Sequence, residues 1–144
     1  MKCLLKYTMS TQFTLTNINI LLAEDDVPIA KIYAKFLSKK GANIFLARDG
    51  IQTLEILSKR DIDILLMDLG MPGMDGYDTL QHVRKNQHTT SLPVIILSNT
   101  TMDERYDWYA KILKIGVSGI YKKYETSLKE LPSLIEKALH VEST

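Results

Sequence analysis

Five short apolar segments, rich in β-branched residues, alternate along the chain with segments whose apolar residues recur every three or four positions. Near-continuous apolarity over a short run predicts a strand that is covered on both faces, as in a parallel sheet. The five predicted strands are Ile18–Ala23, Asn43–Ala47, Ile62–Met67, Pro93–Leu97 and Val117–Tyr121.

A helical pattern follows each predicted strand, and the fourth helix is expected near Met102–Ile115. In the first helix the apolar positions fall at i, i+3, i+4, i+7 and i+8, which predicts one buried stripe. The residues expected to be buried in the five helices are Ile29, Ile32, Tyr33, Phe36 and Leu37; Ile51, Leu54 and Leu57; Tyr77, Leu80 and Val83; Tyr106, Tyr109, Ala110 and Leu113; and Leu131, Leu134, Ile135, Ala138 and Leu139.

This alternation of strands and helices predicts an α/β fold with a doubly wound, five-stranded parallel sheet and right-handed crossovers. In such a sheet, ligands bind at the carboxyl ends of the strands. Polar residues that directly follow the strands are therefore the first candidates for chemistry.

Composition narrows the function classes. The chain has 144 residues, with 18 Lys+Arg and 17 Asp+Glu, and the formal charge of +1 disfavours strong electrostatic binding of nucleic acid or of an acidic membrane surface. No apolar run approaches the roughly 20 residues that a transmembrane helix needs. The single cysteine, Cys3, excludes an internal disulfide and favours a reducing, cytoplasmic location.

Acidic, hydroxyl and basic residues follow four of the predicted strands. Glu24 and Asp25 follow the first strand, Asp68 the third, Ser98 the fourth and Lys123 the fifth. Clustered carboxylates repel one another unless a cation neutralises them, and Mg²⁺ prefers such oxygen ligands. A lysine and a hydroxyl beside that metal suit a phosphoryl group.

The stretch from Ile18 to His140 resembles the receiver domain of two-component response regulators. The motifs that carry the resemblance are LLAEDD at Leu21–Asp26, LLMDLGMPGMDG at Leu65–Gly76, VIILSN at Val94–Asn99 and GVSGIYKK at Gly116–Lys123. The resemblance implies the flavodoxin-like strand order 2-1-3-4-5. It leaves residues 1–17 as a polar, flexible N-terminal tail and residues 141–144 as a short C-terminal tail.

The resemblance also implies a role for each polar residue. Asp68 is the implied phosphoacceptor, which takes a phosphoryl group from a phosphohistidine, and Ser98 and Lys123 bind the phosphoryl oxygens. On this view the protein catalyses its own phosphorylation and dephosphorylation, without being a classical enzyme. The implied ligands of Mg²⁺ (or Mn²⁺) are Glu24, Asp25, Asp68 and the backbone carbonyl of Gly70.

The implied partners are proteins. They are a sensor histidine kinase or phosphotransfer protein upstream and an effector protein downstream, with no direct contact to nucleic acid or membrane. We expect a single-domain regulator, because the receiver pattern fills most of the chain, and a homodimer through the fourth helix, fifth strand and fifth helix is one option. A second apolar stripe on the fourth helix, formed by Trp108, Ile112 and Ile115, is a candidate partner surface.

Three positions depart from the family pattern. Ile120 stands where an aromatic residue usually moves in concert with the hydroxyl residue, here Ser98, so the predicted switch pair is Ser98 and Ile120. Tyr124 stands where proline usually supports a cis bond, so we predict a trans Lys123–Tyr124 bond. Asn99 is larger than the usual small residue and lies next to the phosphoryl site.

Two other functions are compatible with parts of this pattern. The departures at Ile120, Tyr124 and Asn99 favour a receiver-fold interaction module that works without phosphorylation, whereas the intact acidic set speaks against it. A phosphohydrolase of the haloacid dehalogenase type also uses an aspartate nucleophile and Mg²⁺. That class requires a second aspartate two residues further on, where this chain has Gly70.

Overall fold

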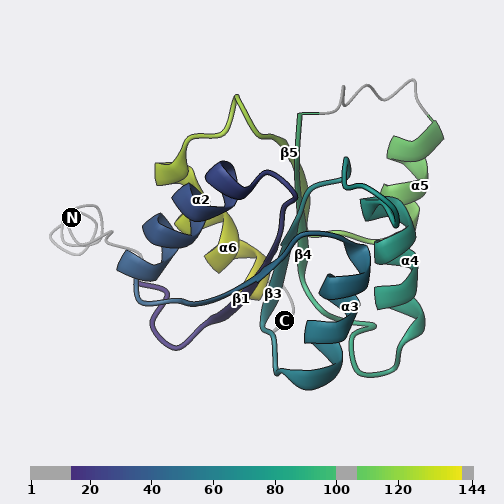
Figure 1. Cartoon of the computed structure of the whole chain (residues 1–144), viewed down its shortest axis with the longest axis horizontal. Helices are drawn as coiled ribbons and strands as arrows, with labels where there is room; N and C mark the ends of the chain where they lie inside the picture. The colour runs from purple at the N-terminus through teal and green to yellow at the C-terminus, as the bar shows by residue number, and fades with distance from the viewer. Residues whose placement is uncertain (1–13, 100–106, 141–144) are drawn as a thin grey trace, which may run out of the picture.

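The computed structural model describes residues 14–99 and 107–140. Within them, five parallel strands form one sheet in the order β2-β1-β3-β4-β5, which confirms the predicted fold class and strand order (Figure 1). The strands are β1 (Asn19–Ala23), β2 (Asn43–Ala47), β3 (Ile64–Met67), β4 (Val94–Ser98) and β5 (Gly119–Lys122).

Helices cover both faces of the sheet, with α2 and α6 on one face and α3, α4 and α5 on the other (Figure 1). The predicted start of the fourth helix, residues 102–106, lies outside the described residues, and so does the predicted burial of Tyr106. The helices are α2 (Val27–Lys39), α3 (Gly50–Lys59), α4 (Gly76–Lys85), α5 (Asp107–Ile115) and α6 (Leu131–His140), and the 3₁₀ turn η1 (Leu128–Glu130) precedes α6.

Aspartate side chains start three of the helices. Asp26, Asp49 and Asp75 accept hydrogen bonds from the backbone N–H groups three residues ahead, at 3.2, 2.8 and 2.9 Å. Such caps satisfy amide groups that the first helical turn leaves unpaired. The capped helix starts and the loops that lead to them lie at the carboxyl edge of the sheet.

The core consists of two apolar clusters, one on each face of the sheet. Side chains of one strand alternate between them: Ile20 and Leu22 pack under α2 and α6, whereas Leu21 and Ala23 pack in the cluster of α3, α4 and α5. This alternation explains why the strands are nearly continuously apolar, because both of their faces are buried.

One residue of α2 and one of α3 that were predicted to be buried are exposed. Ile32 on α2 and Ile51 on α3 have 55% and 57% of their surface accessible, so their assignment to the core is wrong. The sheet-facing side of α2 is instead centred on Ala30, Tyr33 and Leu37. An apolar residue at the margin of a helical stripe fits the periodicity without reaching the sheet.

The two stripes of α5 are exchanged relative to the prediction. Leu113 and Ala110, both predicted to be core, are exposed, Leu113 to 53%, whereas Ile112 is fully buried. Trp108 and Ile115 also pack against the buried cluster beside Ile112. The expectation of an exposed stripe is therefore wrong for Ile112, whereas Trp108 and Ile115 are half-buried. The role of these residues as a partner surface stays a prediction.

The fold begins before the predicted domain boundary. Leu15 is 2% exposed within the cluster beneath α2, and its N–H donates a hydrogen bond to the carbonyl of Lys40 at 2.8 Å. Gly41 has a φ of 99°, and a side chain there would collide with Thr16. The prediction of a flexible tail up to residue 17 is therefore wrong for Leu15 and its neighbour.

None of the helices in the described ranges combines the length and the apolarity that a membrane crossing requires.

Leu15→Ala should lower the free energy of unfolding by about 2–4 kcal/mol, because it leaves a cavity in a packed cluster. Ile51→Ala is the matched control, and its exposed side chain predicts a change below about 1 kcal/mol. Urea unfolding followed by circular dichroism measures both. Equal midpoints for the two variants would contradict the placement of Leu15 in the core.

Candidate functional site

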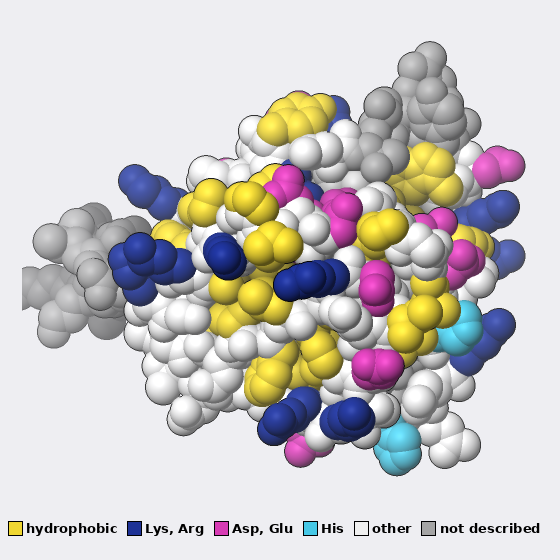
Figure 2. Space-filling view, viewed as in Figure 1, with side chains coloured by type: hydrophobic (Ala, Val, Ile, Leu, Met, Phe, Trp, Pro, Cys, Tyr) yellow, Lys and Arg dark blue, Asp and Glu magenta, His cyan; other side chains and the backbone are white. Residues whose placement is uncertain are grey.

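The backbone brings the polar residues that follow four strands to one edge of the sheet. The N–H of Asp68 donates to the carbonyl of Ala23 at 3.0 Å, and the N–H of Lys123 donates to the carbonyl of Ser98 at 3.1 Å. These bonds continue the sheet ladder past the ends of β3 and β5. Figure 2 shows a group of acidic side chains at this upper end of the sheet.

The ammonium group of Lys123 joins two carboxylates from different strands. Its Nζ lies 3.0 Å from Oδ2 of Asp68 and also forms an ion pair with Oε2 of Glu24. The three side chains are only 8%, 11% and 4% exposed, for Lys123, Asp68 and Glu24 respectively. Because water is largely excluded, these ion pairs are screened far less than pairs on the surface.

Burial and ion pairing act in opposite directions on the pKa of this lysine. Burial alone lowers the pKa of Lys123, but hydrogen bonds to Glu24 and Asp68 outweigh that effect and raise the pKa above its usual value. Burial also raises the pKa of Glu24, against the opposing effect of Lys123 and of a 3.2 Å hydrogen bond from the N–H of Asp26. Lys123 therefore stays charged at neutral pH and supplies the positive charge of the site.

Asp68 is fixed by donors on both of its oxygens. Oδ2 accepts from Lys123, while Oδ1 accepts from the Ser98 hydroxyl at 3.0 Å and from the N–H of Gly70 at 3.1 Å. The Ser98 side chain comes from β4 and is fully buried. The structure thus brings together Asp68, Ser98 and Lys123, the three residues that the sequence predicts as the reactive set.

The loop between β3 and α4 passes close to Asp68 because its glycines permit it. Gly73 adopts a φ of 71°, which L-residues other than glycine rarely adopt. A Cβ atom on Gly76 would lie 2.7 Å from both the Asp68 carbonyl oxygen and the Cα of Leu69. The start of α4 can therefore approach the site only with glycine at position 76.

Three carboxylates form a cradle that suits a hard divalent cation. Glu24, Asp25 and Asp68 each offer an oxygen, and these oxygens lie within 4.8 Å of one another. Oxygen-only donors that include an exposed carboxylate suit Mg²⁺ or Mn²⁺, which keep part of their water shell. Gly70 lies beside this cluster, and the assignment of its carbonyl as a further ligand stays a prediction.

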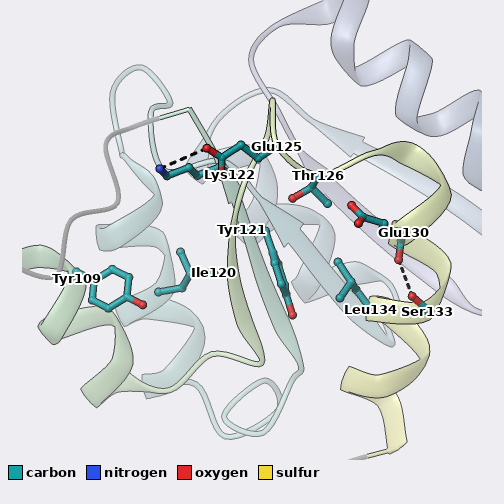
Figure 3. Close-up of a pocket in the computed structure, with 9 residues that line it drawn as sticks. All are labelled: Tyr109, Ile120, Tyr121, Lys122, Glu125, Thr126, Glu130, Ser133 and Leu134. Atoms are coloured by element: carbon teal, nitrogen blue, oxygen red, sulfur yellow. Dashed lines mark hydrogen bonds and ion pairs between the residues drawn. The ribbon is translucent and has the colours of Figure 1, made fainter.

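Of the positions that depart from the family pattern, Asn99 and Tyr124 directly follow the site residues Ser98 and Lys123. The Lys123–Tyr124 bond is trans, as predicted, since no peptide bond in the described ranges is cis. Ile120 packs with the cluster of α3, α4 and α5, whereas Tyr121 packs with the opposite cluster (Figure 3). Tyr121 therefore does not replace the missing aromatic at position 120. Asn99 is exposed at the end of β4.

A hollow of about 540 Å³ lies on the face formed by α5, β5 and α6 (Figure 3). Tyr109 and Ile120 stand on one side of β5 in this view, and Tyr121 and Leu134 on the other. The hollow also contains charged groups of both signs, including Lys122. Within the described residues, this hollow lies on the face that was predicted for a homodimer, which is formed by the fourth helix, fifth strand and fifth helix.

One residue that lines the site was not predicted from the sequence. Tyr33 of α2 was assigned to the core stripe, yet it lines a small cavity together with Glu24, Asp68 and Lys123. The signal that could have identified it is its hydroxyl group, since the other members of that stripe are hydrocarbon side chains. A polar group at a buried position needs a polar partner.

Comparisons with known proteins agree with this arrangement. Residues 20–136 match the response regulator receiver domain family. The Regulator of RpoS from Escherichia coli K12 is 31% identical over 121 residues, which cover 84% of this chain and 34% of that protein. The probable transcriptional regulator ycf29 of Porphyra purpurea is 29% identical over 126 residues, covering 87% of this chain and 58% of that protein.

Among solved structures, the receiver domain of the Francisella response regulator 1452 is similar, with a TM-score of 0.75 and 28% identity, covering 88% of this chain and 99% of that one. The chain thus spans a third to three fifths of the curated relatives above, but nearly all of an isolated receiver domain. From the family match over residues 20–136, the chain belongs to the receiver domains of two-component response regulators.

Proposed function

We propose that this receiver accepts a phosphoryl group on Asp68 from a phosphohistidine of a sensor kinase or phosphotransfer protein. The observation that carries the proposal is the bonding of Asp68, which contacts Lys123 through one oxygen and Ser98 through the other. This arrangement orients a carboxylate beside a fixed positive charge. Phosphoryl transfer depends mainly on such alignment and charge stabilisation.

The proposed reaction is a substitution at phosphorus. An oxygen of Asp68 forms a bond to phosphorus while the phosphorus–nitrogen bond of the donor breaks, and the donor imidazole leaves with the electron pair. Lys123 and the Ser98 hydroxyl already contact the two oxygens of Asp68, at 3.0 Å each, so they lie within reach of the transferred phosphoryl oxygens. Hydrolysis of the acyl phosphate by water then restores the carboxylate.

Mg²⁺ is the cofactor that suits this site, and Mn²⁺ is an alternative. When bound, it would neutralise phosphoryl oxygens that three nearby carboxylates would otherwise repel. Glu24, Asp25 and Asp68 would hold it, with the backbone carbonyl of Gly70 as a fourth protein ligand. Asp25 is the exposed member of this set, which leaves one side of the site open to a donor.

We propose that the signal passes on by protein contact. The hollow between α5 and α6 along β5 offers aromatic, aliphatic and charged groups to an effector or to a second copy of the chain. The reaction partners and the single cysteine are typical of the cytoplasm, which is the proposed location. Direct contact with nucleic acid or membrane is not part of the proposal, given the near-neutral charge of the chain.

The phosphorylation-independent module is the weaker interpretation. Each residue that phosphoryl transfer requires is present and in hydrogen-bond contact with Asp68 or adjacent to it. A binding module would have no need to bury a lysine between two carboxylates, since such an arrangement is costly in desolvation.

Incubation with a small-molecule phosphodonor and Mg²⁺ should add about 80 Da, the mass of one phosphoryl group, to the intact protein. Asp68→Asn should abolish the addition because it removes the nucleophilic carboxylate. Asp63→Asn, at the opposite end of the same strand, is the matched control and should be modified like the wild type. Intact-mass spectrometry at neutral pH measures all three.

Two results of that experiment would contradict the proposal. One is a wild-type protein that stays unmodified at saturating donor and Mg²⁺. The other is an addition that persists in Asp68→Asn, since it would place the phosphoryl group elsewhere.

Asp25→Asn should weaken Mg²⁺ binding at least about tenfold, because the substitution removes a charged ligand from the carboxylate cluster. Asp26→Asn is the control: its side chain caps α2, and asparagine caps equally well, so the effect should stay within about threefold. Titration calorimetry measures both dissociation constants. Equal affinities in the two variants would show that Asp25 is not a ligand.

A further inference from the structure

Tyr33 places a phenol group at the base of the acidic site. It lies on α2 and is 9% exposed, and it lines the same small cavity as Glu24, Asp68 and Lys123. The cavity volume is about 10 Å³, about the least that holds one water molecule. A single water is therefore enough to bridge the phenol and the charged groups across this space.

The hydroxyl of Tyr33 can still donate and accept hydrogen bonds. Within residues 14–99 and 107–140, no hydrogen bond to this hydroxyl is formed. Apart from the three charged residues, the cavity is lined by apolar side chains such as Leu22 and Leu97. The only polar side chains that this hydroxyl can address inside the cavity are those of the acidic site. Burial raises the pKa of Tyr33, so the group remains a hydrogen-bond donor at neutral pH.

Glu24 is the carboxylate that depends on Lys123 for its only cation among the described residues, since its other oxygen, Oε1, accepts from the N–H of Asp26 at 3.2 Å. It is 4% exposed, and its Oε2 depends on the ammonium of Lys123. That same ammonium contacts Asp68, and in the proposed reaction it has to bind a phosphoryl oxygen there. A lysine has only three N–H donors, and a buried carboxylate that loses its partner is strongly destabilised.

We propose that Tyr33 is a positioning residue, whose hydroxyl donates a hydrogen bond to Glu24, directly or through one water, when Lys123 turns to phosphorylated Asp68. The inference rests on the proposed phosphoacceptor function. Tyr33 touches neither the phosphoryl group nor the donor. It acts by keeping Glu24 in place while the lysine changes partners, which stabilises the phosphorylated form relative to the free form.

The test compares Tyr33→Phe with the wild type. Phenylalanine fills the same volume and removes only the hydroxyl, so a packing role alone predicts no change. Tyr121→Phe is the matched control, because Tyr121 packs against the same cluster beneath α2 and α6 but does not line this cavity. The probe is beryllofluoride, which mimics the phosphoryl group on an aspartate.

In the presence of Mg²⁺, Tyr33→Phe should bind beryllofluoride about five- to tenfold more weakly than the wild type, as expected for loss of a hydrogen bond to a charged acceptor. Its urea midpoint and its Mg²⁺ affinity without the probe should stay unchanged. A red shift of tyrosine absorbance on beryllofluoride binding should occur in the wild type and be missing in Tyr33→Phe. Incorporation of 4-aminophenylalanine at position 33, which restores an N–H donor, should recover most of the affinity.

The outcomes separate this inference from the proposed function. A wild-type protein that binds neither beryllofluoride nor a phosphoryl group overturns both. Tight binding that is equal in the wild type, Tyr33→Phe and Tyr121→Phe overturns only the role of Tyr33. If Tyr33→Phe folds poorly, the variant with 4-aminophenylalanine at position 33 is the test. The role of Tyr33 is overturned if this variant is as stable as the wild type but does not recover the affinity for beryllofluoride.

Discussion

The ion pairs of Lys123 are the interaction on which the rest of the site depends. One ammonium from the end of β5 holds a carboxylate from β3 and another from the end of β1, so it ties together three strands that are far apart in the sequence. Without that charge, Asp68 and Glu24 would lie in a nearly dry pocket as two like charges. The strand ends and the capped helices that follow them present these groups at one edge.

The same ion pairs bear on the proposed phosphoryl transfer. Lys123 is shared between two acceptors, so it can move toward a new anion on Asp68 only by weakening its contact with Glu24. In the proposed reaction, binding of a phosphoryl group would therefore redistribute hydrogen bonds that already exist, and few groups would need to be reoriented. On the proposed role of Tyr33, its hydroxyl replaces Lys123 as a partner of Glu24, and a divalent cation held by Glu24, Asp25 and Asp68 would also offset the charge of Glu24.

The sheet and the reactive residues were predictable because both depend on a local signal, an apolar strand that ends in a polar group. This signal singles out Asp68, whereas the choice of Ser98 and of Lys123 over its neighbour Lys122 also needed the resemblance to the receiver family. The faces of short helices were predicted less well, since α5 is apolar on two sides and periodicity does not tell which side meets the sheet. Tyr33 was missed for a related reason, because periodicity places a ring in the core without indicating where its hydroxyl points.

The central claim is that Lys123 holds the site together, and the free energy of unfolding tests it most directly. In EDTA at pH 7, Lys123→Met should lose about 3 kcal/mol, because it leaves two buried carboxylates without their cation. Lys122→Met removes the neighbouring lysine, whose pair with Glu125 is on the surface, and should lose less than about 1 kcal/mol. Equal losses in the two variants, measured by urea unfolding, would contradict this claim.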